Sequence, residues 1–379
     1  MARLRRSSGR LTASTGLTRS KYLLYRELPE PLRLNGREME VWMRRDLATT
    51  GATDSAARAA SDSVKLVAER VVGLSADGTA QLVQPRGVIV DQQGNVYVSD
   101  TDNDRILVFG PDGAVTRTIG SAGSGEGQFN EPRWAGVRCG RHLYVADTWN
   151  ARVVKLDPEG NFLKAWGEGA QNPNGQLATI TDRTEAGNQA NPMGFYGPRS
   201  VAVDAQGNVY IADTGNRRIV VTDTEGEFKY QWGYEGETPG LFEEPSALAV
   251  DPQGNLYVAD VWNSRVQVFA PGPDGKMNPT PTSTWNVPGW QPNSYDDPYI
   301  AANDSGQVFV SIPSRNQVMQ ATTTGEMLLR WGGAGADTAS FTNPSGLFVA
   351  PDGTVYVVDR GNSRVLQFEL PEGVGVQGS

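Results

Sequence analysis

The stretch that decides the fold is residues 254–266, which read GNLYVADVWNSRV. Its first half is a short run of apolar residues that ends at Asp260, as a buried β-strand does, and a second apolar run begins after Arg265, which follows a tight link. Versions of the first half occur five more times along the chain. The central aromatic residues of the six copies are Tyr97, Tyr144, Tyr210, Tyr257, Phe309 and Tyr356. They are spaced 47, 66, 47, 52 and 47 residues apart, which indicates a repeat protein with a base period of 47 and two insertions.

Each copy predicts four antiparallel strands. In the first copy the strands are Arg86–Val90, Val96–Ser99, Arg105–Phe109 and Val115–Ile119. The turn before the second strand ends at Gly94, and glycine supplies the positive φ that tight turns need. Four short strands repeated every 40–50 residues are typical of a β-propeller blade.

The two ends of the repeat region predict how the ring closes. The sixth copy has three strands, Ser345–Val349, Thr354–Val358 and Arg364–Phe368, and the apolar segment 66–72 stands upstream of the first copy where an outermost strand would end. Pairing of that segment with the last blade would leave no free sheet edge. We therefore expect an all-β, six-bladed propeller of four-stranded blades over residues 64–370, closed by an N-terminal strand.

A recurring D-x-x-N-x-R-[VI] motif after the second strand resembles the NHL repeat, for example at Asp147–Val153 and Asp213–Ile219. The resemblance covers about four-fifths of the chain and implies the propeller fold. It leaves the activity open, because propellers host many functions. Arginine outnumbers lysine 28 to 6, which favours a bacterial source.

The charged residues of this motif are expected to be structural. Blade five lacks both charges and has Ile312 and Gln317 in their place, so acid and base disappear together within one repeat. This predicts ion pairs inside each blade, with the asparagine in a left-handed turn. The expected pairs are Asp100/Arg105, Asp147/Arg152, Asp213/Arg218, Asp260/Arg265 and Asp359/Arg364.

The loops between strands two and three and the starts of the first strands share one face of the predicted ring. That face gathers arginines beside large aromatic residues, a composition typical of binding patches. The candidate binding residues are Arg86, Arg133, Trp134, Trp149, Tyr196, Arg199, Trp262 and Tyr299. The alternative is that Trp149 and Trp262 pack on adjacent loops. The insertion 170–193 lies on the same face, either as a cover for the mouth or as a tolerated loop.

Charge limits the partners. The net charge of −9 divides into +6 over residues 1–50 and −15 over residues 51–379, so the propeller should repel a phosphate backbone, and we expect no nucleic-acid partner. We expect a non-catalytic scaffold for a protein, peptide or glycan, most simply as a monomer. The alternative is a metal-dependent lyase or lactonase built around a central divalent ion, and one histidine and one cysteine offer such a site little. No metal or other cofactor, and no catalytic residue, is therefore expected.

The flanking segments predict no membrane-spanning helix and no signal peptide. We expect a flexible basic tail over 1–20, a hairpin-like extension over 21–47, a linker over 48–63 and a second tail over 371–379. The extension is similar to the tail before propellers in some large bacterial membrane-bound glycosyltransferase-like proteins. The chain is expected to be cytoplasmic as written, or an extracytoplasmic module of a larger membrane protein.

Overall fold

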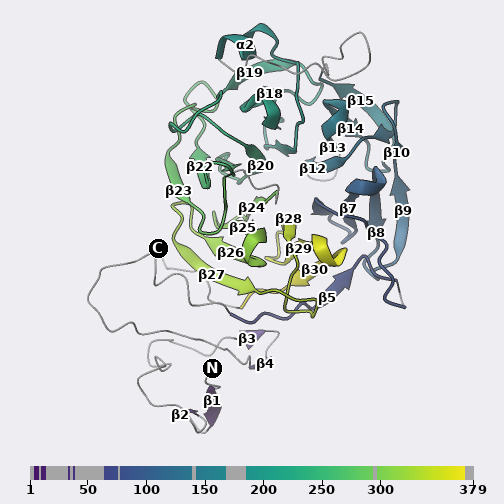
Figure 1. The fold of residues 1–379 in the computed structure, drawn as a ribbon, viewed down its shortest axis with the longest axis vertical. Coiled ribbons are helices and arrows are strands. Elements are labelled where there is room, and N and C mark those ends of the chain that lie inside the picture. The colour runs from purple at the N-terminus through teal and green to yellow at the C-terminus, as the bar shows by residue number, and fades with distance from the viewer. Residues whose placement is uncertain are drawn as a thin grey trace, which may run out of the picture.

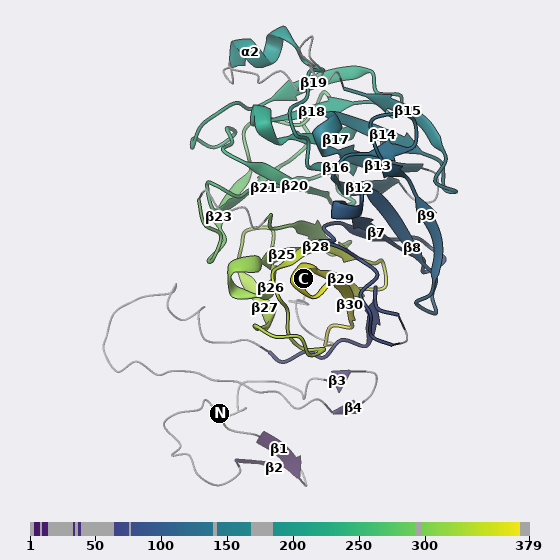
Figure 2. The ribbon, with the colours of Figure 1, turned by 45° about the vertical axis from the view of Figure 1, so that its right-hand side comes forward.

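The structure is a computed structural model that describes residues 64–371 apart from 76, 139–141, 168–184 and 293–296, together with four short strands between residues 4 and 38. Six four-stranded antiparallel sheets stand around a common axis, and the first strand of each lies innermost (Figure 1). Figure 2 shows the same sheets from an oblique angle, with each blade running outward from the axis. The described part of the chain is therefore the predicted six-bladed propeller.

The strands follow the predicted ranges closely. Blades one to three contain β6 (Val88–Val90), β7 (Val96–Asp100), β8 (Arg105–Phe109) and β9 (Val115–Ile119), then β12 (Pro132–Arg138), β13 (His142–Asp147), β14 (Arg152–Leu156) and β15 (Phe162–Trp166), then β16 (Ser200–Val203), β17 (Val209–Asp213), β18 (Arg218–Thr222) and β19 (Phe228–Trp232). Blades four to six contain β20 (Pro245–Val250), β21 (Leu256–Asp260), β22 (Arg265–Phe269) and β23 (Ser283–Asn286), then β24 (Ile300–Ala302), β25 (Val308–Ile312), β26 (Gln317–Ala321) and β27 (Met327–Gly332), then β28 (Pro344–Val349), β29 (Val355–Asp359) and β30 (Arg364–Phe368). A short parallel pair, β10 (Ser121–Ala122) and β11 (Gln128–Phe129), lies in the connector after blade one.

The ring closes through its N-terminal strand. β5 (Arg70–Val72) pairs with β30, and Val72 stands opposite Val365 in the register. Ahead of β5, the backbone N–H of Val64 donates to the carbonyl of Arg330, which joins the incoming chain to blade five. The predicted closure by residues 66–72 is confirmed, with the strand itself limited to 70–72. The last blade therefore takes strands from both ends of the repeat region.

Tight packing between blades explains the apolar repeat. β21 is buried at every residue, because both faces of its sheet are covered by neighbouring blades. Trp166 on the outer strand of blade two packs against blade three, where a Cβ built at Gly226 would lie 2.6 Å from the indole. In blade four the register places Trp285 opposite Val266 on β22, as Trp166 stands opposite Val153. Trp285 packs against Gly325 of blade five, as Trp166 packs against Gly226 of blade three.

The insertions and flanks add little to the ring. Within the insertion 170–193, the described residues include a short helix, α2 (Glu185–Ala190). This helix lies at the rim beside β19 and away from the mouth (Figures 1 and 2). The segment expected as a tail contains an antiparallel pair, β1 (Leu4–Ser7) with β2 (Arg10–Ala13), in which Ser7 stands opposite Arg10. β3 (Arg33–Leu34) pairs with β4 (Arg37–Glu38) inside the expected hairpin, and the remainder of 1–63 and residues 372–379 lie outside the described residues.

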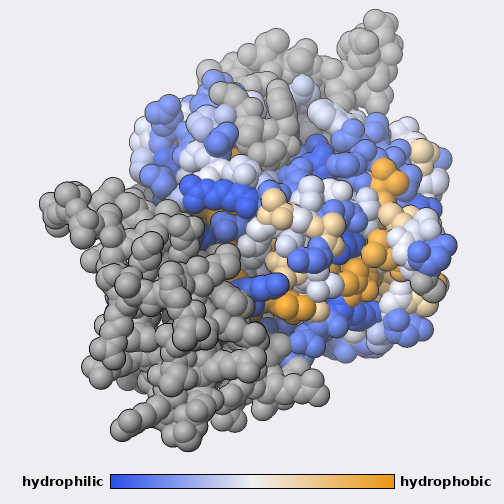
Figure 3. All heavy atoms as spheres, turned by 60° about the horizontal axis from the view of Figure 1, so that its bottom comes forward, coloured by the Kyte–Doolittle hydropathy of each residue, from blue (hydrophilic) through white to orange (hydrophobic). Residues whose placement is uncertain are grey.

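On the side of the molecule that Figure 3 shows, hydrophilic residues are mixed with areas of apolar residues. Exposed large apolar side chains on the outer strands include Val115, Leu163 and Phe228. Among the described residues, none of the helices is both long and apolar enough to cross a bilayer.

Candidate functional site

The repeat motif forms an ion pair in each of five blades. The arginine Nε donates to the aspartate Oδ2, while Oδ1 accepts a backbone N–H from the connector that precedes the blade; in blade three that donor is Tyr196. The Nε–Oδ2 distances are 2.7 Å for Asp100/Arg105, Asp147/Arg152 and Asp213/Arg218 and 2.8 Å for Asp260/Arg265 and Asp359/Arg364. Every one of these aspartates is fully buried. Each carboxylate is thus bonded from both oxygens.

The arginines of the motif also hold the connectors. Arg218 donates to the carbonyls of Asn191 and Gly194, at the end of the insertion, and the other four arginines make similar bonds 24–28 residues back along the chain. The asparagine of the motif does not take the left-handed turn that we expected. It ends a 3-10 turn and donates to the aspartate, as Asn216 does to Asp213, and the left-handed residue is the next one, Arg217 at φ 56°. The side-chain bond needs the asparagine inside the turn, which moves the positive φ one residue onward.

Three arginines from three blades converge on one carboxylate at the mouth of the ring. Arg86, Arg133 and Arg199 open the inner strands of blades one, two and three, and all three reach Asp297, which precedes blade five. The Nη1–carboxylate distances are 2.8 Å for Arg133 and 2.9 Å for Arg199, and Arg86 forms the third contact. Arg199 also pairs with Glu244, which precedes blade four. We call Arg86, Arg133, Arg199 and Asp297 the arginine centre.

The arginine centre is buried and carries more donors than its acids accept. Arg86 is 7% exposed and Arg133 6% exposed, and their Nε atoms have no hydrogen-bond partner within the described part of the chain. Burial and the nearby Arg360 lower the pKa of Arg86 to about 10. Burial, with Arg199 and Arg86 close by, lowers the pKa of Arg133 well below its usual range. Desolvation and mutual repulsion therefore act on these cations together.

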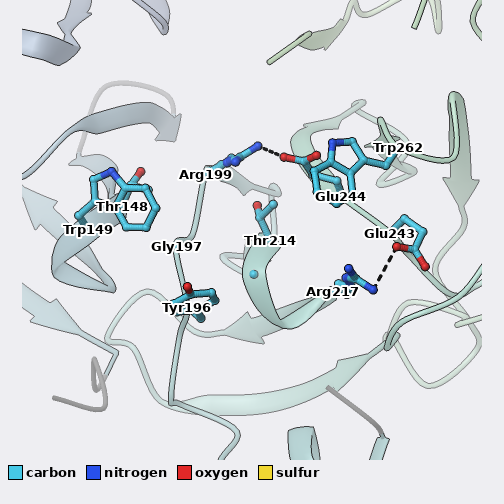
Figure 4. Close-up of a pocket in the computed structure, with 11 residues that line it drawn as sticks. Thr148, Trp149, Tyr196, Gly197, Arg199, Thr214, Arg217, Glu243, Glu244 and Trp262 are labelled. Atoms are coloured by element: carbon cyan, nitrogen blue, oxygen red, sulfur yellow. Dashed lines mark hydrogen bonds and ion pairs between the residues drawn. The ribbon is translucent and has the colours of Figure 1, made fainter. Parts of the chain in front are cut away.

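An aromatic pocket adjoins the centre at Arg199. It has a volume of about 150 Å³ and is formed where blades two, three and four meet. Its lining is Thr148, Trp149, Tyr196, Gly197, Arg199, Thr214, Gly215, Arg217, Glu243, Glu244 and Trp262. Figure 4 shows Trp149 and Trp262 on opposite sides of this pocket, with Arg199 directed at Glu244 and Arg217 at Glu243. Arg217 lies 3.0 Å from Glu243 and 2.5 Å from Glu235.

The aromatic residues of the pocket are held by specific contacts. Trp149 is 39% exposed, although a Cβ at Gly197 would lie 3.9 Å from its ring. Tyr196 covers Gly215, the blade-three position at which blades two and four have Trp149 and Trp262, and a Cβ there would lie 2.0 Å from the tyrosine ring. The small residue at 215 therefore makes room for Tyr196. Trp262 is half-buried and also packs on the apolar core.

Six of the eight predicted binding residues lie in the aromatic pocket or in the arginine centre. Trp149, Tyr196, Arg199 and Trp262 line the pocket, and Arg86, Arg133 and Arg199 form the centre. Tyr299 is 3% exposed, and burial raises its pKa. Trp134 belongs to β12, and its side chain lies outside what the structure describes. Sequence reasoning missed Asp297 and Glu244.

The missed acids share a sequence position. Each stands directly before the proline that precedes or opens an inner strand, and the six residues there are Gln84, Glu131, Gly197, Glu244, Asp297 and Asn343. Five of them have positive φ, from 46° at Asp297 to 57° at Gly197, and only Glu244 does not. Aligning this column would have revealed acids around the mouth.

The donor set at the mouth does not suit a divalent cation. Residues 64–371, as far as they are described, hold no group of three or more His, Cys, Asp or Glu side chains arranged for a metal ion. The carboxylate of Asp297 is already engaged by three guanidinium groups, and their charge would oppose a cation placed there. The arrangement instead favours an anion.

The six blades define a repeat propeller, and four segments match a known repeat. Residues 82–109, 195–222, 242–269 and 341–368 match the NHL repeat, and these segments fall in blades one, three, four and six. The chain is therefore a six-bladed β-propeller in which four blades contain NHL repeats.

Known proteins resemble the chain in part. Protein brain tumor from Drosophila melanogaster is 49% identical over 43 residues, which is 11% of this chain and 4% of that relative's length. Among solved structures, a gluconolactonase from Xanthomonas campestris is similar with a TM-score of 0.53 and 13% identity, covering 81% of this chain and 97% of its own. A streptogramin B lyase is similar with a TM-score of 0.50 and 13% identity, covering 79% and 97%. At this identity the likeness shows the fold alone.

Proposed function

We propose that this propeller is a non-catalytic binding module whose mouth face holds a peptide segment of a protein partner. The observation that carries the proposal is the aromatic pocket, where Trp149, Tyr196 and Trp262 lie among paired charges of both signs. Aromatic residues beside arginines dominate the energetics of protein interfaces. Peptides offer apolar side chains, charges and amides together, and this mixture matches the lining of the pocket. A nucleic acid is disfavoured by the net charge of −15 over residues 51–379.

The pocket is suited to rigid recognition. Thr148 donates to the carbonyl of Pro198, and Thr214 donates to the carbonyl of Pro245, so each loop that lines the pocket is bonded to the next blade. A preorganised surface loses little conformational entropy on binding. The exposed ring of Trp149 is then available as an anchor.

A metal-dependent lyase or lactonase is the alternative. Proteins named for such activities share the fold at 13% identity, which does not extend to the site. The alternative needs a divalent cation at the mouth of the ring. The arginine centre lies at this mouth, and its three guanidinium groups favour an anion over a cation. We also propose a bacterial source, from the excess of arginine over lysine.

The test is binding of the purified chain to peptide and glycan arrays. We expect peptides to be captured, and Trp149→Ala and Trp262→Ala to weaken capture by about tenfold or more, as loss of an interface anchor does. Phe228→Ala is the matched control, because Phe228 is 41% exposed on β19 and outside the pocket. Unchanged capture by both tryptophan variants, capture of glycans alone, or stoichiometric calcium or zinc in the purified protein would contradict the proposal.

A further inference from the structure

The arginine centre has an excess of buried hydrogen-bond donors. Each guanidinium carries five N–H groups, so three of them present far more donors than one carboxylate can accept. Within the described part of the chain, Arg86 and Arg133 both form an ion pair with Asp297, and Arg133 forms a second, at 3.7 Å, with Glu131. Buried donors without partners cost free energy, and an additional acceptor would relieve that cost.

Asp297 shows which chemical group the centre accepts. Its carboxylate is contacted by guanidinium groups from three consecutive blades of the ring. Carboxylates accept paired hydrogen bonds from guanidinium groups, so the centre already binds a carboxylate. That carboxylate is supplied by the chain's own connector.

The route to the centre runs through the aromatic pocket. Arg199 belongs to both, because its side chain lines the pocket and also donates to Asp297. It is the most exposed of the three arginines, with 18% of its side chain accessible against 9% for Arg86 and 7% for Arg133. A ligand in the pocket would therefore meet the centre at Arg199.

We infer that the centre binds a carboxylate of the peptide ligand, which competes with Asp297 and Glu244 for Arg199 and its neighbours. This inference rests on the proposed function and adds the chemical class of the ligand, an acidic peptide. The anchor is either an Asp or Glu side chain or the C-terminal carboxylate, since the three offer the same group. Asp297 then acts as the internal counter-ion of the site.

The first experiment compares matched peptides. The array carries each sequence as an acidic form, with Asp, Glu and a free C-terminus, and as an amide form, with Asn, Gln and a carboxamide. We expect wild type to prefer the acidic forms by at least about tenfold, the scale of one charge-assisted contact. Arg133→Gln should reduce that preference, because it removes one of the three guanidinium groups that contact the carboxylate, and it should leave the aromatic contacts unchanged, because Arg133 does not line the pocket. Mixed pairs, with only the C-terminus or only the side chains changed, identify the source of the carboxylate.

The second experiment measures chemical rescue. Asp297→Gly removes the internal carboxylate at a position with φ 46°, which glycine tolerates, as Gly197 shows in blade three. We expect sodium acetate to raise the unfolding temperature of this variant by about 2 °C or more beyond sodium chloride of equal ionic strength, and to raise that of wild type less. Stabilisation by inorganic phosphate but not by acetate would overturn the carboxylate assignment.

The outcomes separate the two proposals. Capture that depends on Trp149 and Trp262 but is equal for acidic and amide peptides would overturn this inference and leave the proposed function standing. Capture that is unaffected by the tryptophan variants would overturn the proposed function. If Asp297→Gly does not fold, the comparison of wild type with Arg133→Gln on the array still decides the inference.

Discussion

Two sets of arginines in this ring have different surroundings. Each of the five motif arginines pairs with its own buried aspartate and also bonds backbone carbonyls, as Arg218 does with Asp213 and the carbonyls of Asn191 and Gly194. The three arginines of the centre share Asp297, and within the described part of the chain the Nε atoms of Arg86 and Arg133 have no hydrogen-bond partner. We call the five motif arginines with their aspartates the matched set, because their hydrogen-bond donors have acceptors. We call the three arginines of the centre the surplus set, because they carry more donors than Asp297 can accept.

The difference distinguishes a structural charge from a binding charge. A buried ion pair whose hydrogen bonds are complete contributes specificity to the fold and offers nothing to a ligand. A buried cation with unused donors is costly to the fold and valuable to an anion that arrives. Three predictions test whether this division holds.

The largest expected effect is in the matched set. Asp213→Ala should lower the free energy of unfolding by about 3–5 kcal/mol, because it leaves the fully buried Arg218 without its carboxylate. The double variant Asp213→Ile with Arg218→Gln copies blade five, which has Ile312 and Gln317 at these positions, and should lose about 2 kcal/mol less. Urea denaturation of both variants measures the difference. Equal losses would show that the two residues do not act as a pair.

A smaller effect is expected in the surplus set. Arg133→Gln should change the free energy of unfolding by about 1 kcal/mol or less, because Asp297 keeps two arginines and one desolvated cation is removed. Arg218→Gln, its counterpart in the matched set, should cost several-fold more. Denaturation of the two variants side by side compares their losses in the free energy of unfolding. An equal loss for Arg133→Gln and Arg218→Gln would show that the arginine centre stabilises the fold as the motif ion pairs do.

The smallest effect is a pH dependence at Glu244. Burial raises the pKa of its carboxyl group, against the opposing charge of Arg199. Between the ordinary glutamate pKa and this raised value, the folded state holds a proton that the unfolded state has lost, so the stability that Glu244 contributes falls as pH rises through that window. Glu244→Gln has no such titration and should therefore become more stable relative to wild type as pH rises above the ordinary glutamate pKa of about 4.5. Denaturation curves at several pH values check this, and a variant that loses stability relative to wild type as pH rises would contradict the assignment.

The sequence predicts the fold well because the same strand pattern is repeated in each of the six blades. Tyr97, Tyr144 and their counterparts fix the strand register, and residues 66–72 stand at the distance that closure requires. One error lies in the repeat motif itself, where the turn places the left-handed residue directly after the asparagine.

The candidate site was only half predictable. The arginines and tryptophans stand in aligned loops, so topology alone gathers them on one face. Asp297 stands in an irregular connector, and its contact with arginines of blades one, two and three depends on the curvature of the whole ring. Pairing between such distant segments has no local signal, and only the column before the strand-opening prolines points to it.

The shared construction of blade six has a mechanical consequence. Because β5 and β30 lie side by side, polypeptide leading into the disc and polypeptide leading out of it meet the disc at the same sector of its circumference. The aromatic pocket belongs to blades two, three and four, across the axis from that sector. A tether attached through either flanking segment would therefore meet the propeller at blade six and leave the pocket on the opposite side of the ring.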